Sequence, residues 1–280
     1  MSTEMPRASR DSLHNIFLRV LMVAVASCMA GGAATAQGKT PRFRVIAIAE
    51  HGGVHKPFVD AAKIWLEELA SESNFSVDHI EDTEKIDDTF LAKYKLFIQL
   101  NYPPYHWTDT AQAAFIKYIE QGKGGWIGFH HATLLGEFDG FQMWPWFHKL
   151  MGGIRFKNYI ATFVDGSVTV EDKNHPAMKG IASPFAIENE EWYTYDNSPR
   201  PNVHVLASVD ENTYSPATDL KMGDHPVIWT NEHVKAANIY IFMGHHPELF
   251  HNKSFTQIFT NSIFWAAGRR ENPAKGGGHK

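Results

Sequence analysis

Residues 43–70 read FRVIAIAEHGGVHKPFVDAAKIWLEELA, a short apolar run followed by a segment with helical periodicity. The run 43–49 predicts a buried strand. From about Pro57 to Ala70 the apolar residues fall on one face, and a proline near the start favours a helix there. A strand followed by a glycine-containing turn and a helix is the repeating unit of an α/β fold.

The same alternation continues along the chain. Strands are predicted at 75–80, 95–100 and 125–129, with helices from Thr108 to Glu120 and from Phe255 to Ala267. The second half is richer in β-branched runs, which lie at 161–170, 203–209, 226–230 and 238–243. We therefore predict one α/β domain over 37–270, with a mostly parallel sheet and helices on both faces.

The first 36 residues have the features of a secretory signal peptide. Three arginines precede an apolar run over 20–30, and Ala-Thr-Ala at 34–36 supplies a cleavage site. The run is shorter than the roughly 20 residues of a membrane-spanning helix. Alternatively, Val-Ala-Ser-Cys at 25–28 resembles a lipobox. The sequence predicts a periplasmic or secreted protein, or an inner- or outer-membrane lipoprotein anchored through Cys28.

Composition argues against several classes of function. Cys28 is the only cysteine, so a chain beginning at Gln37 has no disulfide, thiolate zinc site or cysteine nucleophile. A net charge of −5 disfavours a nucleic-acid partner, because binding phosphates needs a basic surface. The glycines at 52–53 and 122–125 lack the spacing of a phosphate loop, so we predict no nucleotide cofactor. The glycine-rich tail 271–280 is predicted to be disordered.

Histidines follow three of the predicted strands. His51 and His55 come after the first strand, His130 and His131 after the fourth, and His245 after the last. Because the carboxyl ends of parallel strands share one edge of a sheet, we expect these imidazoles to line a common site. Imidazole binds divalent metals and titrates near neutral pH, so the site suits a metal or proton transfer. For each histidine alone, a surface or hydrogen-bonding role is the alternative.

The residues expected to carry the chemistry fall into three sets. The catalytic residues are His130, Glu191 and His245. The ligands of a divalent metal, with zinc as the first candidate, are His51, His55, His130 and His245. The substrate-binding residues are His131, Tyr102, Trp107, Trp192 and Tyr193. Flat rings with polar groups can stack on sugars, and core packing is the alternative for them. In a strand neighbouring residues face opposite sides, so only one of Glu190 and Glu191 is expected to point inward.

Gly128-Phe129-His130-His131-Ala132 resembles a motif of the ThuA-like (trehalose-utilisation) family. Five further segments agree in order and spacing: 174–180, 190–193, 226–229, 243–245 and 264–269. The resemblance covers roughly 42–269 and implies a flavodoxin-like fold of the class I glutamine amidotransferase type. In those amidotransferases a cysteine nucleophile follows this strand, and here His130 matches its position. The resemblance therefore does not imply a glutaminase.

The same resemblance implies a role in the catabolism of disaccharides or oxidised (keto) sugars. Our leading hypothesis is an exported enzyme, a hydrolase, lyase or isomerase, that acts on a small carbohydrate. A non-catalytic carbohydrate-binding accessory protein is the first alternative. A structural or protein-interaction module is the second. Membrane association is expected only if Cys28 is lipidated.

Overall fold

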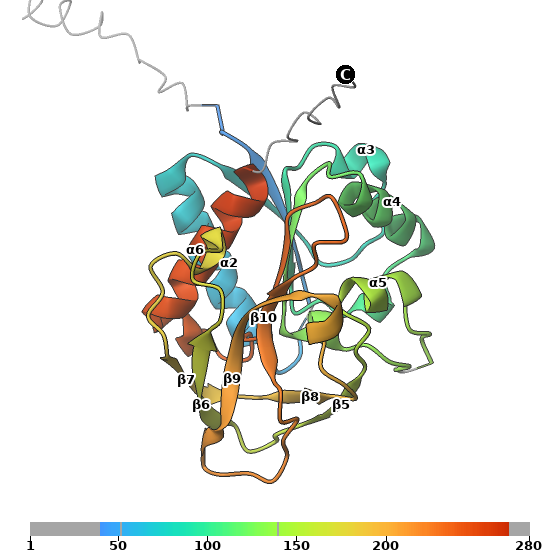
Figure 1. Ribbon diagram of the computed structural model, residues 1–280. Coiled ribbons are helices and arrows are strands. Elements are labelled where there is room, and N and C mark those ends of the chain that lie inside the picture. The colour runs from blue at the N-terminus through green and yellow to red at the C-terminus, as the bar shows by residue number, and fades with distance from the viewer. Residues whose placement is uncertain (1–39, 51, 139, 269–280) are drawn as a thin grey trace, which may run out of the picture. The chain divides into compact units, whose positions relative to one another are not determined.

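A nine-stranded sheet forms the centre of the part that the structure, a computed structural model, describes: residues 40–50, 52–138 and 140–268 (Figure 1). Five strands are mutually parallel, in the order β2 (Ser76–Ile80), β1 (Arg44–Ala49), β3 (Leu96–Leu100), β4 (Gly125–Phe129) and β11 (Asn238–Ile241). The last four of these strands are almost fully buried. Burial on both faces explains why their sequences are continuous apolar runs.

Beyond β11 the sheet becomes antiparallel, through β10 (Pro226–Thr230), β9 (His204–Ser215), β6 (Val164–Val170) and β7 (Phe185–Glu190). Of the nine described strands of this sheet, only β10 and β6 are antiparallel to the rest. A separate antiparallel ribbon joins β5 (Phe156–Tyr159) to β8 (Tyr193–Tyr195). The predicted α/β class with a mostly parallel sheet is confirmed.

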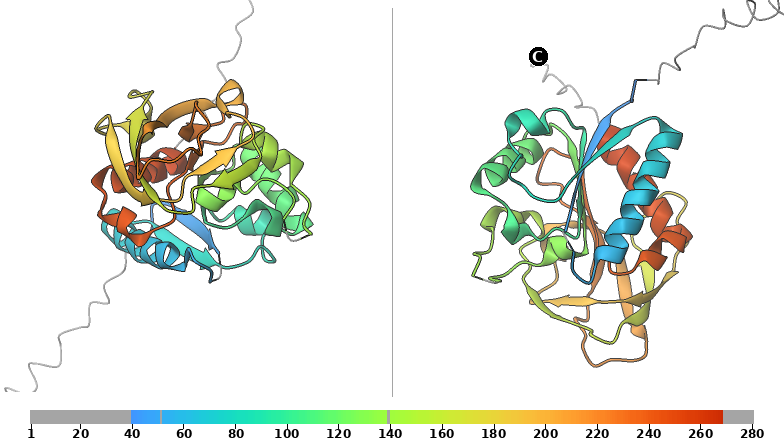
Figure 2. Two further views of the ribbon diagram at one scale, coloured as in Figure 1. Left: turned by 90° about the horizontal axis from the view of Figure 1, so that it is seen from below. Right: turned by 180° about the vertical axis from the view of Figure 1, so that it is seen from behind.

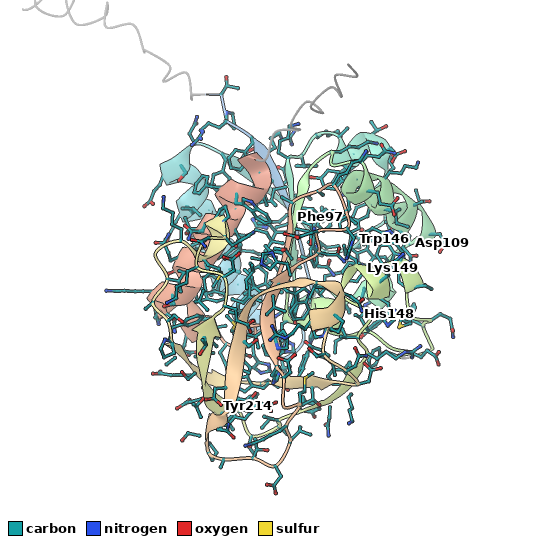
Figure 3. The ribbon with its side chains drawn as sticks, in the orientation of Figure 1. Phe97, Asp109, Trp146, His148, Lys149 and Tyr214 are labelled. Carbon is teal, nitrogen blue, oxygen red and sulfur yellow. The ribbon has the colours of Figure 1, made fainter. Side chains whose placement is uncertain are left out.

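Helices cover both faces of the sheet (Figure 2). One face carries α2 (Lys56–Ser73) and α6 (Lys253–Gly268), and the other carries α3 (Asp88–Leu91), α4 (Asp109–Glu120) and α5 (Pro145–Leu150). The Thr108 side chain caps α4 by accepting a hydrogen bond from the Ala111 amide. Figure 3 shows Phe97 of β3 inside this two-faced arrangement and Asp109 at the outer side of α4.

Several predictions fall outside the described residues. These are the signal peptide over 1–36 with Cys28, the metal ligand His51, and the disordered tail over 271–280. Among the helices of the described ranges, none is both long enough and apolar enough to cross a bilayer.

Candidate functional site

The carboxyl ends of β1, β3, β4 and β11 meet at one edge of the sheet, and polar residues follow them. Glu50 follows β1, Asn101 follows β3, His130 follows β4, and His245 comes shortly after β11. His55 occupies the N-terminal cap of α2. This edge is where α/β sheets bind ligands, and the structure brings His55, His130, His131 and His245 together there.

Three imidazoles and one carboxylate converge at this edge, and we call His55, His130, His245 and Glu191 the histidine cluster. One ligand atom from each lies within 4.8 Å of those of the others. Glu191 Oε2 is 3.3 Å from His130 Nε2, 3.4 Å from His245 Nδ1 and 3.9 Å from His55 Nε2. Ligands bound at 2.0–2.1 Å around a tetrahedral ion lie roughly 3.3 Å apart. The spacing therefore suits one metal ion.

Backbone conformation and a hydrogen bond orient the His130 ring. His130 has a φ of 35°, in the left-handed region that few side chains adopt. Its Nδ1 lies 3.2 Å from the Phe242 carbonyl oxygen, so Nδ1–H donates and Nε2 faces Glu191. A hydrogen bond of this kind is typical of metal-binding histidines. Gly244 permits the arrangement, because a Cβ there would lie 2.8 Å from His130 Cβ.

Other residues around the site share this unusual backbone. Asn101 has a φ of 51°, Asn189 of 54° and Phe163 of 34°. The Phe163 ring lies 4.6 Å from the His245 ring, and the Asn101 side chain donates to the Gly244 carbonyl oxygen. Such conformations cost about 1–3 kcal/mol each and gather at functional sites. Their concentration here supports a functional reading of the cluster.

Four polar atoms of the site are buried without a hydrogen-bond partner: His55 Nε2, His245 Nδ1, Glu50 Oε2 and Asn101 Oδ1. An unpaired buried polar atom costs about 1–3 kcal/mol. A cation among the cluster atoms would satisfy both nitrogens. Imidazole nitrogens with a carboxylate oxygen are a donor set that suits divalent transition metals. The residues present therefore fit a divalent metal.

The protonation states also favour binding a cation. Burial lowers the pKa of His130 to about 4, although the hydrogen bond with Glu191 opposes the shift. Burial, with the neighbouring histidines, lowers the pKa of His55 far below its usual range. For Glu191, burial alone would raise the pKa, but His130 and His245 outweigh it and lower the value to about 2. At neutral pH His55 and His130 are thus neutral and Glu191 is ionised, as metal ligands must be.

His131 and Glu50 lie beside the cluster. His131 Nδ1 is 2.9 Å from Glu50 Oε2 and 3.2 Å from the Asn101 carbonyl oxygen. Only the contact with Asn101 has hydrogen-bond geometry, which leaves the Glu50 oxygen unpaired. Glu50 also lies 3.8 Å from His55 Nδ1. Glu50 was missed by the sequence reasoning, although its position directly after β1 matches that of His130 after β4.

Both glutamates of the Glu190-Glu191 pair reach the site, whereas strand alternation predicted one. The strand β7 ends at Glu190, after Asn189 with its φ of 54°, so alternation does not extend to Glu191. Glu190 is fully buried, and its oxygens accept hydrogen bonds from the Glu191 and Gly244 amides. Burial raises the pKa of Glu190 to about 7. Glu190 ties the loop of Glu191 to the loop of His245.

The predicted substrate-binding rings lie in different surroundings. Tyr193 is buried with its ring 4.3 Å from His130, and Tyr102 is buried near His106. Trp107 packs among core rings, 4.9 Å from Phe115 and 5.3 Å from Trp144. Trp192 is fully buried; its ring stacks on Phe242 and its Nε1–H donates to Val164. Core residues therefore occupy the faces of Trp107 and Trp192 that were predicted to stack on a sugar.

Residues 44–266 match the family model named ThuA and described as trehalose utilisation. The chain belongs to the ThuA family. A solved ThuA-like protein from Bacteroides uniformis is 29% identical, covers 86% of this chain and 97% of its own, and superposes with a TM-score of 0.74. The resemblance read from the motifs is thus confirmed.

More distant structures share the fold alone. A ThuA-like protein from Parabacteroides merdae is 15% identical, with 81% of this chain and 90% of that one covered and a TM-score of 0.58. A carbohydrate deacetylase is 11% identical, with 81% of this chain but 32% of its own covered and a TM-score of 0.53. No curated protein matches the chain.

Proposed function

We propose that this ThuA-family chain is an exported enzyme of disaccharide or keto-sugar catabolism that works with one divalent metal in its histidine cluster. The convergence of three buried imidazole nitrogens on the Glu191 oxygen carries this proposal. The family description of trehalose utilisation supports a sugar as substrate. The metal would supply Lewis-acid polarisation of a sugar oxygen or an activated water.

The chain's own groups would then position the ligands and move protons. His55, His130 and His245 would hold the metal together with Glu191. The His131 Nδ1–H is held by the Asn101 carbonyl oxygen, which leaves Nε2 able to accept a proton from the substrate. The reaction we propose is proton transfer next to a sugar carbonyl or hydrolysis of the glycosidic bond of a keto-sugar. Cysteine chemistry has no part in it, since His130 stands at the nucleophile position.

Metal content and turnover of two ligand variants test the proposal. His130→Asn keeps a residue that tolerates a positive φ, and His245→Ala removes a second ligand. We expect about one divalent ion per purified wild-type chain by elemental analysis, and its loss in both variants together with turnover of keto-trehalose. His204→Ala is the control, because His204 pairs with Asp172 and Glu232 at the surface.

Two results would contradict the proposal in different ways. If wild-type protein takes up no added zinc, manganese or cobalt, the proposal that the histidine cluster binds a metal is contradicted. Protein that binds trehalose and metal but turns over no disaccharide or keto-sugar would instead favour the accessory carbohydrate-binding protein.

Export is a separate part of the proposal. We expect the exported chain to begin at Gln37, or at a lipidated Cys28 if the lipobox is used. Mass spectrometry of the N-terminal peptide from the periplasmic and membrane fractions distinguishes the two. Recovery of a full-length chain in the cytoplasmic fraction alone would contradict export.

A further inference from the structure

Two of the exposed apolar side chains, Val54 and Tyr159, adjoin residues of the site. Among the described residues, the large hydrophobic side chains that remain exposed are Val54, Ile64, Phe141 and Tyr159. Val54 directly precedes His55. Tyr159, 45% exposed, is the cross-strand partner of Tyr193, whose ring lies against His130. Exposed apolar groups that lie together on a soluble protein often mark a binding surface.

Phe141 belongs to a group of rings from two loops. It is 46% exposed and lies 6.0 Å from Tyr105, which is itself 5.2 Å from Phe138. Backbone hydrogen bonds between Phe138 and Phe141 hold the second loop. Tyr105 comes from the loop after β3, and the two phenylalanines from the chain after β4. We call Tyr105, Phe138, Phe141 and Tyr159 the aromatic rim.

Ring contacts connect the aromatic rim to the histidine cluster. Phe138 lies 6.0 Å from Phe156, and Phe156 lies 5.0 Å from Tyr193. Tyr193 in turn lies 4.3 Å from His130. Phe156 and Tyr159 are the two ends of β5, so one short strand links both parts of the rim to the ring beside His130. Phe138 is therefore connected to His130 through packed rings, and Tyr159 through its strand pairing with Tyr193.

We propose that the aromatic rim binds one hexose ring of a disaccharide or longer glycan while the neighbouring ring occupies the histidine cluster. The inference rests on the proposed function and adds the place where the second sugar ring binds. A hexose presents a face of C–H groups that packs on flat side chains, while its hydroxyls stay hydrated at the edge. Trp107 and Trp192 are enclosed in the core, whereas Phe141 and Tyr159 have exposed surface for such a ring.

Binding of trehalose and glucose to metal-loaded protein tests the rim. The variants are Phe141→Ala, Tyr159→Ala and their double substitution, and Ile64→Ala is the matched control because Ile64 is 63% exposed on α2. Titration calorimetry should show trehalose affinity about 3- to 10-fold weaker in each single variant, the scale of one aromatic contact. Glucose affinity should not change, because one ring can occupy the cluster alone. Thermal unfolding checks that the exposed substitutions leave the fold intact.

Three results would overturn the rim proposal. These are an unchanged trehalose affinity in the double variant, an equal loss for glucose and trehalose, and no measurable trehalose binding to wild-type protein. Metal content and turnover of the same preparations separate this failure from failure of the proposed function. If the double variant keeps its metal, its turnover and its trehalose affinity, the rim proposal fails while the proposed function of the histidine cluster stands.

Discussion

The histidine cluster and a second buried group, built from His225 and Glu211, differ in how many of their polar atoms have hydrogen-bond partners. In the second group, His225 Nδ1 lies 3.0 Å from Glu211 Oε1 and 3.1 Å from the Tyr214 hydroxyl. The Met222 and Gly223 amides donate to the two Glu211 oxygens. Figure 3 shows Tyr214 of this group on β9, in the antiparallel part of the sheet. Glu211 thus closes the loop before β10 onto β9, and we call this group the Glu211 clasp.

The histidine cluster has the opposite organisation. Three nitrogens face the single Glu191 oxygen, and two of those nitrogens have no hydrogen-bond partner. In the Glu211 clasp both carboxylate oxygens are occupied by backbone amides, and only one imidazole is present. A buried histidine beside a glutamate is therefore not by itself a metal site. The clasp has one unpaired nitrogen, His225 Nε2, whereas in the histidine cluster two unpaired nitrogens and a third imidazole converge on one carboxylate oxygen, an arrangement that could hold a metal.

Glu191→Ala should have the largest effect of the predicted substitutions, because it removes the carboxylate of the histidine cluster. Loss of this carboxylate leaves only the three imidazoles as ligands, so we expect the purified protein to lose its metal and turnover to fall about 1,000-fold. The metal-free variant should lose some stability relative to metal-free wild type, because His130 and His245 favour the ionised Glu191, but less than Glu211→Ala loses, because no backbone group depends on Glu191. Elemental analysis, kinetics and urea unfolding measure the three quantities. A large loss of stability with metal retained would place Glu191 with Glu211 as a structural residue.

Glu211→Ala should instead lower the stability of the fold and leave metal content unchanged. It leaves two buried amides and His225 without their acceptor, and removing one partner of a buried pair costs about 3–5 kcal/mol. We expect the free energy of unfolding to fall by about that amount while metal content per folded chain is unchanged. Glu211→Gln, which keeps an acceptor oxygen, should lose less. Loss of metal from correctly folded Glu211→Gln would contradict the separation of the two groups.

The central strands were predictable because their signal is local. The apolar runs of β1, β3 and β4 and the amphipathic α2 and α4 are set by each segment's own composition. The strand β5 was not predicted, and β7 and β8 were anticipated only as one strand-like run over 188–193. Residues of β7 alternate between buried and exposed for part of their length, but pairing with β6 through a bulge decides where they lie. Such a strand depends on its partner more than on its own sequence.

The site was predictable as far as topology determines it. His130 and His245 follow adjacent parallel strands, β4 and β11, and therefore had to lie near each other. Side-chain direction was not predictable. Trp107 and Trp192 stand close to the site in sequence, yet both rings turn into the core. Glu50 escaped notice because one glutamate after a strand has no distinctive pattern.

Acid should affect the histidine cluster in a predictable direction. Burial lowers the pKa of His130 from 6.5 to about 4, so between these values the unfolded chain binds a proton that the folded chain does not. Stability must then decrease as the pH falls through this range, and His55 adds an effect of the same sign. For metal-free protein we expect His130 to account for about 2 kcal/mol of the stability lost between pH 7.5 and pH 5.

Urea unfolding in a chelator at the two pH values measures this loss. His130→Asn should lose less stability on acidification than wild type, because asparagine does not titrate. His204→Ala, at the surface, should match wild type. An equal loss in His130→Asn and wild type would show that the buried imidazole is not what makes the cluster acid-sensitive.

The smallest effect should come from Glu50, which borders the cluster without belonging to it. Its Oε2 lies 2.9 Å from His131 Nδ1 and 3.8 Å from His55 Nδ1, so its charge favours a proton on these nitrogens and leaves His55 Nε2, which faces Glu191, free to bind a metal. Glu50→Gln keeps the size and removes the charge, and loss of such a supporting carboxylate weakens metal binding about tenfold. Competition with a coloured chelator measures that affinity, and Glu248→Gln, on the exposed turn after His246, is the control. Equal zinc affinity in both variants would mean that the backbone and Glu191 alone orient the histidines. A tenfold loss confined to Glu50→Gln would show that the unpaired Glu50 oxygen supports zinc binding at the cluster.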